Sequence, residues 1–340
     1  MTAACVLERL AGWVPPHRVT NEQLPDSWGV TDAWVRSRTG IGSRHRVEPG
    51  IATSDLAIEA AGRVLGDDRA VDTVILATST PDHPIPATAP ALADRLGLGP
   101  VAAFDVSAVC SGFVYALATA AGWVAAGLSE RILLVAADVY STLLDPEDRS
   151  AGIVFGDGAG AVLLRRGEPG EPGSLLGFDL GTDGANADLI TVPAGGSRHR
   201  ATGQVAADGD HHFRMHGSEV YKHAVMNMSG SVKGLLTRLG WRMEDVDRFI
   251  GHQANARILS SVCERIGLPR QKCVGNLASV GNTGAASIPL ALAQAHNEGL
   301  LQAGQRVVLT GFGGGLTWGS TALIWPDLHQ VPHSTPEKPS

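Results

Sequence analysis

The chain has 340 residues, of which 44% are hydrophobic and 18% charged, and its net charge of -7 gives a pI near 5.9. This length exceeds that of a single hydrophobic core, so we expect two domains or two fused halves. The acidic charge argues against nucleic-acid binding, because a basic face is needed to neutralise phosphates. The 42 glycines are too many for a helical bundle and indicate a soluble α/β protein with many tight turns.

Four cysteines lie far apart and form no CxxC pair: Cys5, Cys110, Cys263 and Cys273. We expect neither a zinc site nor a disulfide framework, and reduced thiols fit a cytoplasmic protein. Residues 1–16 lack the basic start and apolar core of a signal peptide, and no apolar run is long enough to span a membrane. We expect residues 327–340, rich in Pro, His, Ser and charge, to be a disordered tail.

In the first half of the chain, apolar runs alternate with segments of helical period. Helices are predicted at 54–65, 88–96 and 110–126. Strands are predicted at 71–79, 101–107, 131–138 and 160–165. This alternating order favours an α/β fold around a buried, mostly parallel sheet.

The second half repeats this plan after a stretch rich in Gly and Pro at 166–173. We place a boundary there, between an N-terminal half (1–170) and a C-terminal half (171–326). Strands are predicted at 175–179, 247–251, 305–311 and 321–325, and helices near 217–239, 255–266 and 284–297. Matching segments, such as ERILLVAADVYS with QRVVLTGFGGG, indicate a duplicated α/β unit. A functional site would lie where loops from both halves converge.

Cys110 follows a predicted strand and begins an apolar helix in DVSAVCSGFVYALATAAGW. The positive end of the helix and its unpaired amides would stabilise a thiolate, which favours a nucleophilic role. A single cysteine is more often a small buried hydrophobic residue, so position alone does not assign catalysis. We interpret the other three cysteines as structural.

Three further features lie on turns between predicted strands and helices, where α/β proteins place their sites. His252 in FIGHQANARI and Asn282 in SVGNTGAASIPLA have ordinary alternatives as a hydrogen-bonded histidine and a helix cap. The run 311–319, GFGGGLTWG, can bring backbone N–H groups to a carbonyl oxygen, as an oxyanion hole requires, or it can be a plain tight turn. GDGAG at 156–160 precedes a strand, so we reject a dinucleotide-binding turn.

Six stretches in this order resemble β-ketoacyl-acyl carrier protein synthase III, a branch of the thiolase superfamily: WVRSRTGIGSRHR, VCSGFVYAL, GDGAGAVLL, GHQANARI, GNTGAAS and GFGGGLTWG. The resemblance covers about residues 5–325 and includes enzymes that prime polyketide pathways. It implies a duplicated, five-layered α-β-α-β-α thiolase-like fold in a homodimer. It also implies a catalytic trio of Cys110, His252 and Asn282, with the amides of Cys110 and Gly314 forming the oxyanion hole.

The resemblance also implies binding roles. The residues that it places against the coenzyme A moiety are Trp34, Arg38, Arg149 and Asn255. Arg257 would help to bind an acidic carrier protein, although Glu264 stands where the family's docking helix often has a lysine. Ile85 takes the place of an often aromatic residue that reaches across the dimer to floor the acyl pocket. This smaller floor would leave room for a longer or branched primer.

The implied reaction is a decarboxylative Claisen condensation that initiates fatty acid or polyketide synthesis. Cys110 takes the acyl group of an acyl-CoA starter, and malonyl-acyl carrier protein loses carbon dioxide to give the attacking carbanion, in ping-pong order. The chain shows no metal or pyridoxal motif, so we expect no cofactor; neutral His252 and the Asn282 amide would stabilise the enolate. We expect neither a nucleic acid nor a membrane as a partner.

Two alternatives remain open. An acyltransferase would pass the acyl group from Cys110 to a hydroxyl or amine of a natural product, but it would have no enolate for Asn282 to stabilise. A non-catalytic thiolase-fold partner subunit would be expected to have lost one residue of the trio, and all three are present.

Overall fold

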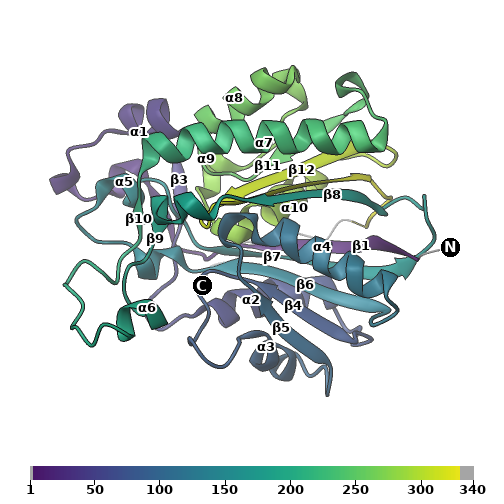
Figure 1. Ribbon diagram of the computed structural model, residues 1–340, viewed down its shortest axis with the longest axis horizontal. Coiled ribbons are helices and arrows are strands. Elements are labelled where there is room, and N and C mark those ends of the chain that lie inside the picture. The colour runs from purple at the N-terminus through teal and green to yellow at the C-terminus, as the bar shows by residue number, and fades with distance from the viewer. Residues whose placement is uncertain (1–2, 330–340) are drawn as a thin grey trace, which may run out of the picture.

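The computed structural model describes residues 3–329 and contains two sheets (Figure 1). The first, in the order β1-β7-β6-β4-β5, comprises β1 (Ala4–Trp13), β7 (Gly158–Gly167), β6 (Arg131–Asp138), β4 (Thr73–Ala77) and β5 (Ala102–Val106). The second, in the order β11-β12-β13-β8, comprises β11 (Arg248–Gly251), β12 (Arg306–Gly313), β13 (Thr317–Ile324) and β8 (Leu175–Thr182). Two short pairs flank them: β2 (Arg18–Thr20) with β3 (Ser43–His45), and β9 (Ile190–Thr191) with β10 (Arg214–Met215).

Helices complete the layers. Six lie close to the ranges predicted from the sequence: α2 (Thr53–Leu65), α3 (Ala89–Arg95), α4 (Gly112–Ala125), α7 (Gly217–Leu239), α8 (Ala256–Ile266) and α10 (Ser287–Asn297). Four further helices were not predicted: α1 (Asp32–Thr39), α5 (Arg149–Gly152), α6 (Ser197–Arg200) and α9 (Leu277–Val280).

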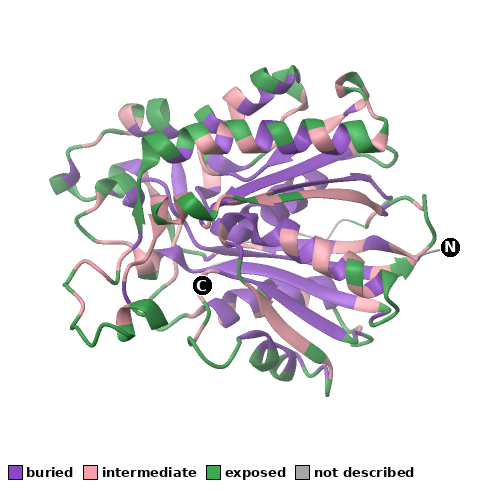
Figure 2. Cartoon of the chain, viewed as in Figure 1, coloured by how far each residue is buried: buried purple, intermediate pink, exposed green. Residues whose placement is uncertain are grey.

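The sequence of the helices decides which layer each occupies. α4 and α10 are apolar over most of their surface and lie between the two sheets, in contact with both. α2 and α3 cover the outer face of the first sheet, and α7 covers the second with α8 packed beside it. Figure 2 shows the inner strands of the sheets buried, the edge strands β5 and β8 mostly intermediate, and the outer helix faces exposed. The predicted α-β-α-β-α layering is confirmed.

The prediction of a mostly parallel sheet is wrong. β4 pairs parallel with β5 and β6, and β11 with β12, whereas β1, β7, β13 and β8 all join their neighbours antiparallel. Strands buried on both faces form continuous apolar runs in either direction, so the pattern of residues does not report direction.

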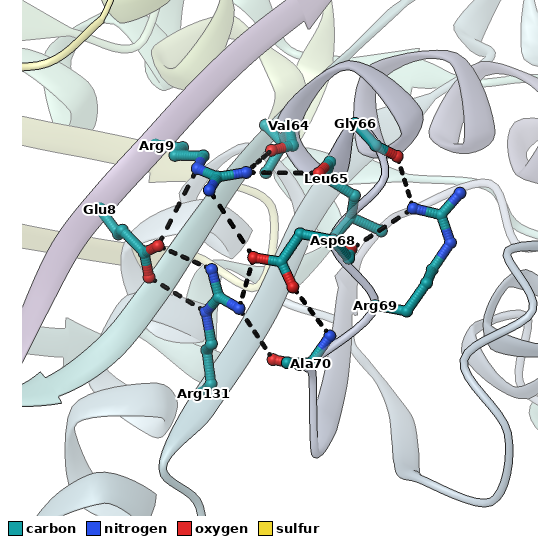
Figure 3. A network of polar contacts seen from close by, with 9 residues as sticks. All are labelled: Glu8, Arg9, Val64, Leu65, Gly66, Asp68, Arg69, Ala70 and Arg131. Atoms are coloured by element: carbon teal, nitrogen blue, oxygen red, sulfur yellow. Dashed lines mark hydrogen bonds and ion pairs between the residues drawn. The ribbon is translucent and has the colours of Figure 1, made fainter.

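Strand β1 was not predicted because Glu8 and Arg9 interrupt its apolar run. Both charges belong to an ion-pair network that ties the edge of the first sheet to the end of α2 (Figure 3). Arg131, at the start of β6, donates to Glu8 and lies 2.7 Å from the carboxylate of Asp68. The charged residues of β1 therefore serve the fold.

Each sheet is drawn from one half of the chain, and the turn between β7 and β8 contains most of the stretch 166–173. The division into halves at residue 170 stays a prediction. Most of the tail predicted to be disordered, residues 330–340, lies outside the described residues.

The expectation of unpaired cysteines is wrong for two of the four. Cys263, near the end of α8, forms a disulfide with Cys273, while Cys5 and Cys110 are free and buried. The pairing depends on the chain turning back after α8, so that Val274 bonds to Phe249 of β11. The two cysteines are 10 positions apart in the sequence, which is not a recognised disulfide spacing, so the sequence gave no sign of the pairing.

Candidate active site

Cys110 lies on a strained turn between β5 and α4, within a 3-10 turn at Val109–Ser111. Val109 has a φ of 47°, in the left-handed region that β-branched residues rarely adopt. Hydrogen bonds hold this turn: the Ser111 hydroxyl donates to the carbonyl of Ala108, and Thr317 of β13 donates to the same oxygen. Cys110 is thereby fixed at the start of α4, where both halves of the chain meet.

A cavity of about 40 Å³ joins the three residues of the predicted trio. Cys110, His252 and Asn282 line it together, from the end of β5, the end of β11 and the turn before α10. The rest of its wall is mainly apolar and includes Phe155, Phe213, Val220, Ala224, Met228 and Phe312. The structure thus brings together three polar groups that are far apart in sequence, in a cavity with a mainly apolar wall.

His252 is buried and neutral. Its Nδ1 lies 2.6 Å from the hydroxyl of Ser287 on α10, and the same hydroxyl oxygen accepts from the amide of Gln253. When the Ser287 hydroxyl donates to Nδ1, the imidazole proton lies on Nε2. Burial lowers the pKa of His252 to about 3, so the ring is uncharged at neutral pH and can donate from Nε2.

The side-chain amide of Asn282 is oriented by its own turn. Its Oδ1 accepts from the amide of Gly284, which leaves the Nδ2 group as a donor facing the cavity. The backbone amide of Asn282 donates to the carbonyl of Val154, and its carbonyl accepts from the amide of Gly156. Asn282 is therefore held by the N-terminal half although it belongs to the C-terminal half.

We expected the helix start to stabilise a Cys110 thiolate, but burial has the larger effect on the pKa of this thiol. Burial, and after it the nearby Asp138 carboxyl, raise the pKa of Cys110 to about 12. Asp138 is itself buried and accepts from the amides of Ser79 and Ala285, while burial raises its pKa to about 7. The resting nucleophile is therefore a thiol, since desolvation outweighs the amides at the helix start.

The glycine-rich run packs directly against the nucleophile turn. A Cβ on Gly313 would lie 2.6 Å from the nitrogen of Cys110, so only glycine allows this approach. Thr317 ties the run to the turn, because its hydroxyl oxygen lies 2.8 Å from that of Ser111 and 3.0 Å from the carbonyl oxygen of Gly314. The oxyanion hole formed by the amides of Cys110 and Gly314 stays a prediction on this frame.

The residues predicted to contact coenzyme A gather on one surface. Arg38 and Arg149 both lie against the ring of Trp34, with guanidinium carbons 5.2 and 5.8 Å from its centre. Asn255, at the start of α8, donates to the carbonyl of Arg38, and the neighbouring Arg257 donates to that of Ser37. This places two cations and an aromatic ring where α1, α5 and α8 meet, an arrangement suited to phosphate and base recognition.

Two other predicted residues lie apart from the cavity. Ile85 is 87% exposed and does not line the cavity of its own chain, so its predicted place in an acyl pocket requires a second copy. Glu264 is exposed on α8, the helix that begins beside Asn255 and Arg257.

Sequence analysis missed Asp138, Tyr140 and Ser287. Asp138 ends strand β6 and Tyr140 follows it, in the segment AADVYS that the internal repeat pairs with the GFGGG run. That pairing was a usable signal, because equivalent strand ends of a duplicated unit face one site. The sequence around Ser287 carried no such signal, since a serine at a helix start is ordinarily a cap. Within residues 3–329, no group of three His, Cys, Asp or Glu side chains could hold a metal ion, and no helix is long and apolar enough to cross a membrane.

Two family models match the chain: 3-oxoacyl-(acyl-carrier-protein) synthase III over residues 104–184, and the C-terminal model of the same family over residues 236–325. The chain is 54% identical over 331 residues to β-ketoacyl-(acyl-carrier-protein) synthase III 5 of Streptomyces coelicolor, covering 96% of this chain and 99% of the relative. It is 48% identical to the synthase III of Pseudomonas aeruginosa PAO1, covering 96% and 98%.

Solved structures agree. The crystal structure of the synthase III FabH from Pseudomonas aeruginosa PAO1 has a TM-score of 0.89 at 46% identity, covering 96% of this chain and 99% of that chain. The priming β-ketosynthase of the R1128 polyketide pathway has a TM-score of 0.87 at 29% identity, covering 96% and 98%. Together with the thiolase-like layers, these likenesses show that the chain belongs to the β-ketoacyl-acyl carrier protein synthase III family of condensing enzymes.

Proposed function

We propose that this chain catalyses the decarboxylative Claisen condensation that initiates fatty acid or polyketide synthesis, joining an acyl-CoA starter to malonyl-acyl carrier protein. The observation that carries the proposal is the cavity itself. It combines a buried thiol, a neutral histidine whose Nδ1 lies against the Ser287 hydroxyl, and an asparagine whose Oδ1 is bonded to the Gly284 amide. A nucleophile and two uncharged donors are what acyl transfer followed by enolate formation requires.

The first step is acylation of Cys110. Its sulfur attacks the carbonyl carbon of the acyl thioester, a carbon–sulfur bond forms, and the bond to the coenzyme A sulfur breaks. The thiol proton leaves with the coenzyme A thiolate, so no charge remains on the protein. Backbone amides of Cys110 and Gly314 would hold the intermediate oxyanion, and each such donor is typically worth about 3 kcal/mol in the transition state.

The second step is decarboxylation. The thioester oxygen of the malonyl group accepts from Nε2 of His252 and from Nδ2 of Asn282, while the bond to the carboxylate breaks and carbon dioxide leaves. The electron pair enters an enolate that the two donors stabilise. A neutral histidine suits this role, because its low pKa keeps it uncharged before the enolate forms. The enolate carbon then attacks the acyl group, and Cys110 leaves as a thiolate and regains a proton.

Binding of the two thioesters would use the surface where α1, α5 and α8 meet. Trp34, Arg38 and Arg149 fit the nucleotide and phosphates of coenzyme A, and Asn255 holds Arg38 in place. Arg257, at the start of α8, fits an acidic carrier protein. We place the reaction in the cytoplasm, without a cofactor.

A homodimer is part of the proposal. β5 is an edge strand of the first sheet, and Ile85 projects from the loop that follows β4. In a dimer, Ile85 of a second copy would floor the acyl pocket, and its small side chain favours a longer or branched starter. A panel of acetyl-, propionyl-, isobutyryl- and hexanoyl-CoA tests this, and a sharp preference for acetyl-CoA would reject it.

The experiment that tests the function supplies an acyl-CoA with malonyl-acyl carrier protein labelled in its free carboxyl. Intact-protein mass spectrometry should find the acyl group on the wild-type protein and not on Cys110→Ala, and labelled carbon dioxide should appear with the β-ketoacyl product. An adduct that persists in Cys110→Ala contradicts the assignment of the nucleophile. Acyl transfer to an alcohol or amine without carbon dioxide release would instead identify an acyltransferase, and an inert thiol would identify a non-catalytic subunit.

A further inference from the structure

Tyr140 lies beside the nucleophile and has no part in the reaction as described above. It begins a 3-10 turn directly after β6, is only 1% exposed, and its Oη lies 3.9 Å from Sγ of Cys110, within hydrogen-bonding range for sulfur. The ring is firmly held: it stacks on Phe155 with centres 4.5 Å apart and meets the edge of Phe213 at 5.8 Å. Gly284 makes room for it, since a Cβ there would lie 2.5 Å from the tyrosine ring.

The phenol is the donor in this contact once Cys110 is a thiolate, because a thiolate has no proton to give. Burial raises the pKa of Tyr140 well above its usual value, so the hydroxyl keeps its proton throughout the accessible pH range. A phenol is a strong donor, whereas sulfur is a weak acceptor that becomes a better one as it gains negative charge. The hydrogen bond therefore strengthens when Cys110 becomes a thiolate.

Three titratable groups face the sulfur of Cys110 from different elements. Asp138 from β6 raises the pKa of Cys110, as burial does, while His252 after β11 is neutral. Tyr140 acts in the opposite direction, because its hydrogen bond lowers the pKa of Cys110. It is thus a side chain that offsets part of the cost of placing a charge on a buried sulfur.

Building on the proposed function, we propose that Tyr140 is a positioning residue for the nucleophile, donating a hydrogen bond to the sulfur of Cys110 whenever that sulfur carries negative charge. This happens twice in a cycle. In acylation, Tyr140 stabilises the sulfur as its proton passes to the departing coenzyme A thiolate and the new carbon–sulfur bond forms. In condensation, it stabilises the thiolate that leaves when the enolate carbon takes the acyl group. Tyr140 keeps its own proton in both steps.

The test is Tyr140→Phe, which retains the stacked ring and removes only the hydroxyl. Tyr115→Phe is the matched control: it removes a hydroxyl from α4 that donates to the carbonyl of Gly181 at 2.9 Å and is not in the cavity. For each protein, the rate of Cys110 alkylation by iodoacetamide is measured from about pH 7 to pH 10. Acyl adduct formation from acetyl-CoA is followed by intact mass. Melting temperatures establish that both variants are folded.

Loss of the donor should raise the pKa of Cys110 by about one unit, so Tyr140→Phe should alkylate and acylate about tenfold more slowly at each pH, while Tyr115→Phe behaves as wild type. Unchanged alkylation in Tyr140→Phe overturns the inference, even if acylation slows, because the residue would then act on the acyl group and not on the sulfur. Failure of the proposed function is a separate result: wild-type protein would take no acyl group, and the alkylation comparison would still decide the role of Tyr140.

Discussion

Replacing Gly313 with alanine tests whether the contact between the glycine-rich run and the nucleophile turn sets the rate of acylation. The new Cβ would lie 2.6 Å from the nitrogen of Cys110, 3.1 Å from that of Ser111 and 3.2 Å from the carbonyl oxygen of Ala108. All three are backbone atoms, so no side chain can rotate away. Real Cβ contacts essentially never fall below 3.0 Å, and the two segments must therefore separate by at least about 0.4 Å.

This separation should cost about 1–3 kcal/mol of stability, the usual range for an overpacked core. The rate of Cys110 acylation should also fall, because a displacement of about 1 Å at reacting groups can lower a rate about 100-fold. We expect Gly313→Ala to remain folded and to acylate Cys110 at least about tenfold more slowly in a single-turnover mass-spectrometric assay. The control is Gly177→Ala on β8, where a Cβ meets only Leu239 and Leu235 at 3.5 and 3.7 Å. Acylation of Gly313→Ala at the wild-type rate would refute the reasoning.

Three other predictions follow from the surroundings of the site and the frame. The pKa of His252 is about 3 in the folded protein and ordinarily 6.5, so below pH 6.5 the unfolded chain takes up a proton that the folded protein does not. The free energy of unfolding therefore falls as the pH is lowered from 6.5 towards 3. Wild-type protein should thus lose about 3 kcal/mol more than His252→Gln between pH 6.5 and pH 4 in urea unfolding, and equal losses would contradict the buried neutral ring. Ser287→Ala should slow carbon dioxide release about tenfold and leave acylation unchanged, because Nδ1 loses the partner that fixes the tautomer; a reversed pattern would exclude this role. Arg131→Met should lower the free energy of unfolding by about 1 kcal/mol without changing activity, and a difference that does not shrink in high salt would argue against the ion pairs with Glu8 and Asp68 as its cause.

The sequence was sufficient for the layers and for the principal members of the site. The repeat of strand and helix patterns indicates a duplicated α/β unit, and the resemblance to the synthase III family implies the layers, with helices between two sheets. Cys110, His252 and Asn282 were found because each lies on a turn at a strand end, where the halves of a duplicated unit converge.

What could not be predicted depends on contacts between distant segments. The direction of a buried strand leaves no mark on its residues, so the antiparallel pairing of β7 was missed. The disulfide of Cys263 with Cys273 depends on how the chain turns after α8. The resting state of Cys110 was misjudged because a helix start is visible in sequence, whereas burial and the approach of Asp138 are not. The repeat could have placed the segment of Tyr140 at the site, but only the folded chain shows that its hydroxyl lies near the sulfur.

The assignment of acylation to Cys110 and of decarboxylation to His252 and Asn282 is tested most directly by the variant Asn282→Ala. Acylation and decarboxylation are measured in one reaction. The amide donor of Asn282 serves only the malonyl thioester in this mechanism, so the variant should still take an acyl group on Cys110 at close to the wild-type rate. Release of labelled carbon dioxide from malonyl-acyl carrier protein should fall at least about 100-fold, the typical loss for one such donor. A variant that releases carbon dioxide normally, or that fails to acylate Cys110 while remaining folded, would contradict the assignment of the two steps.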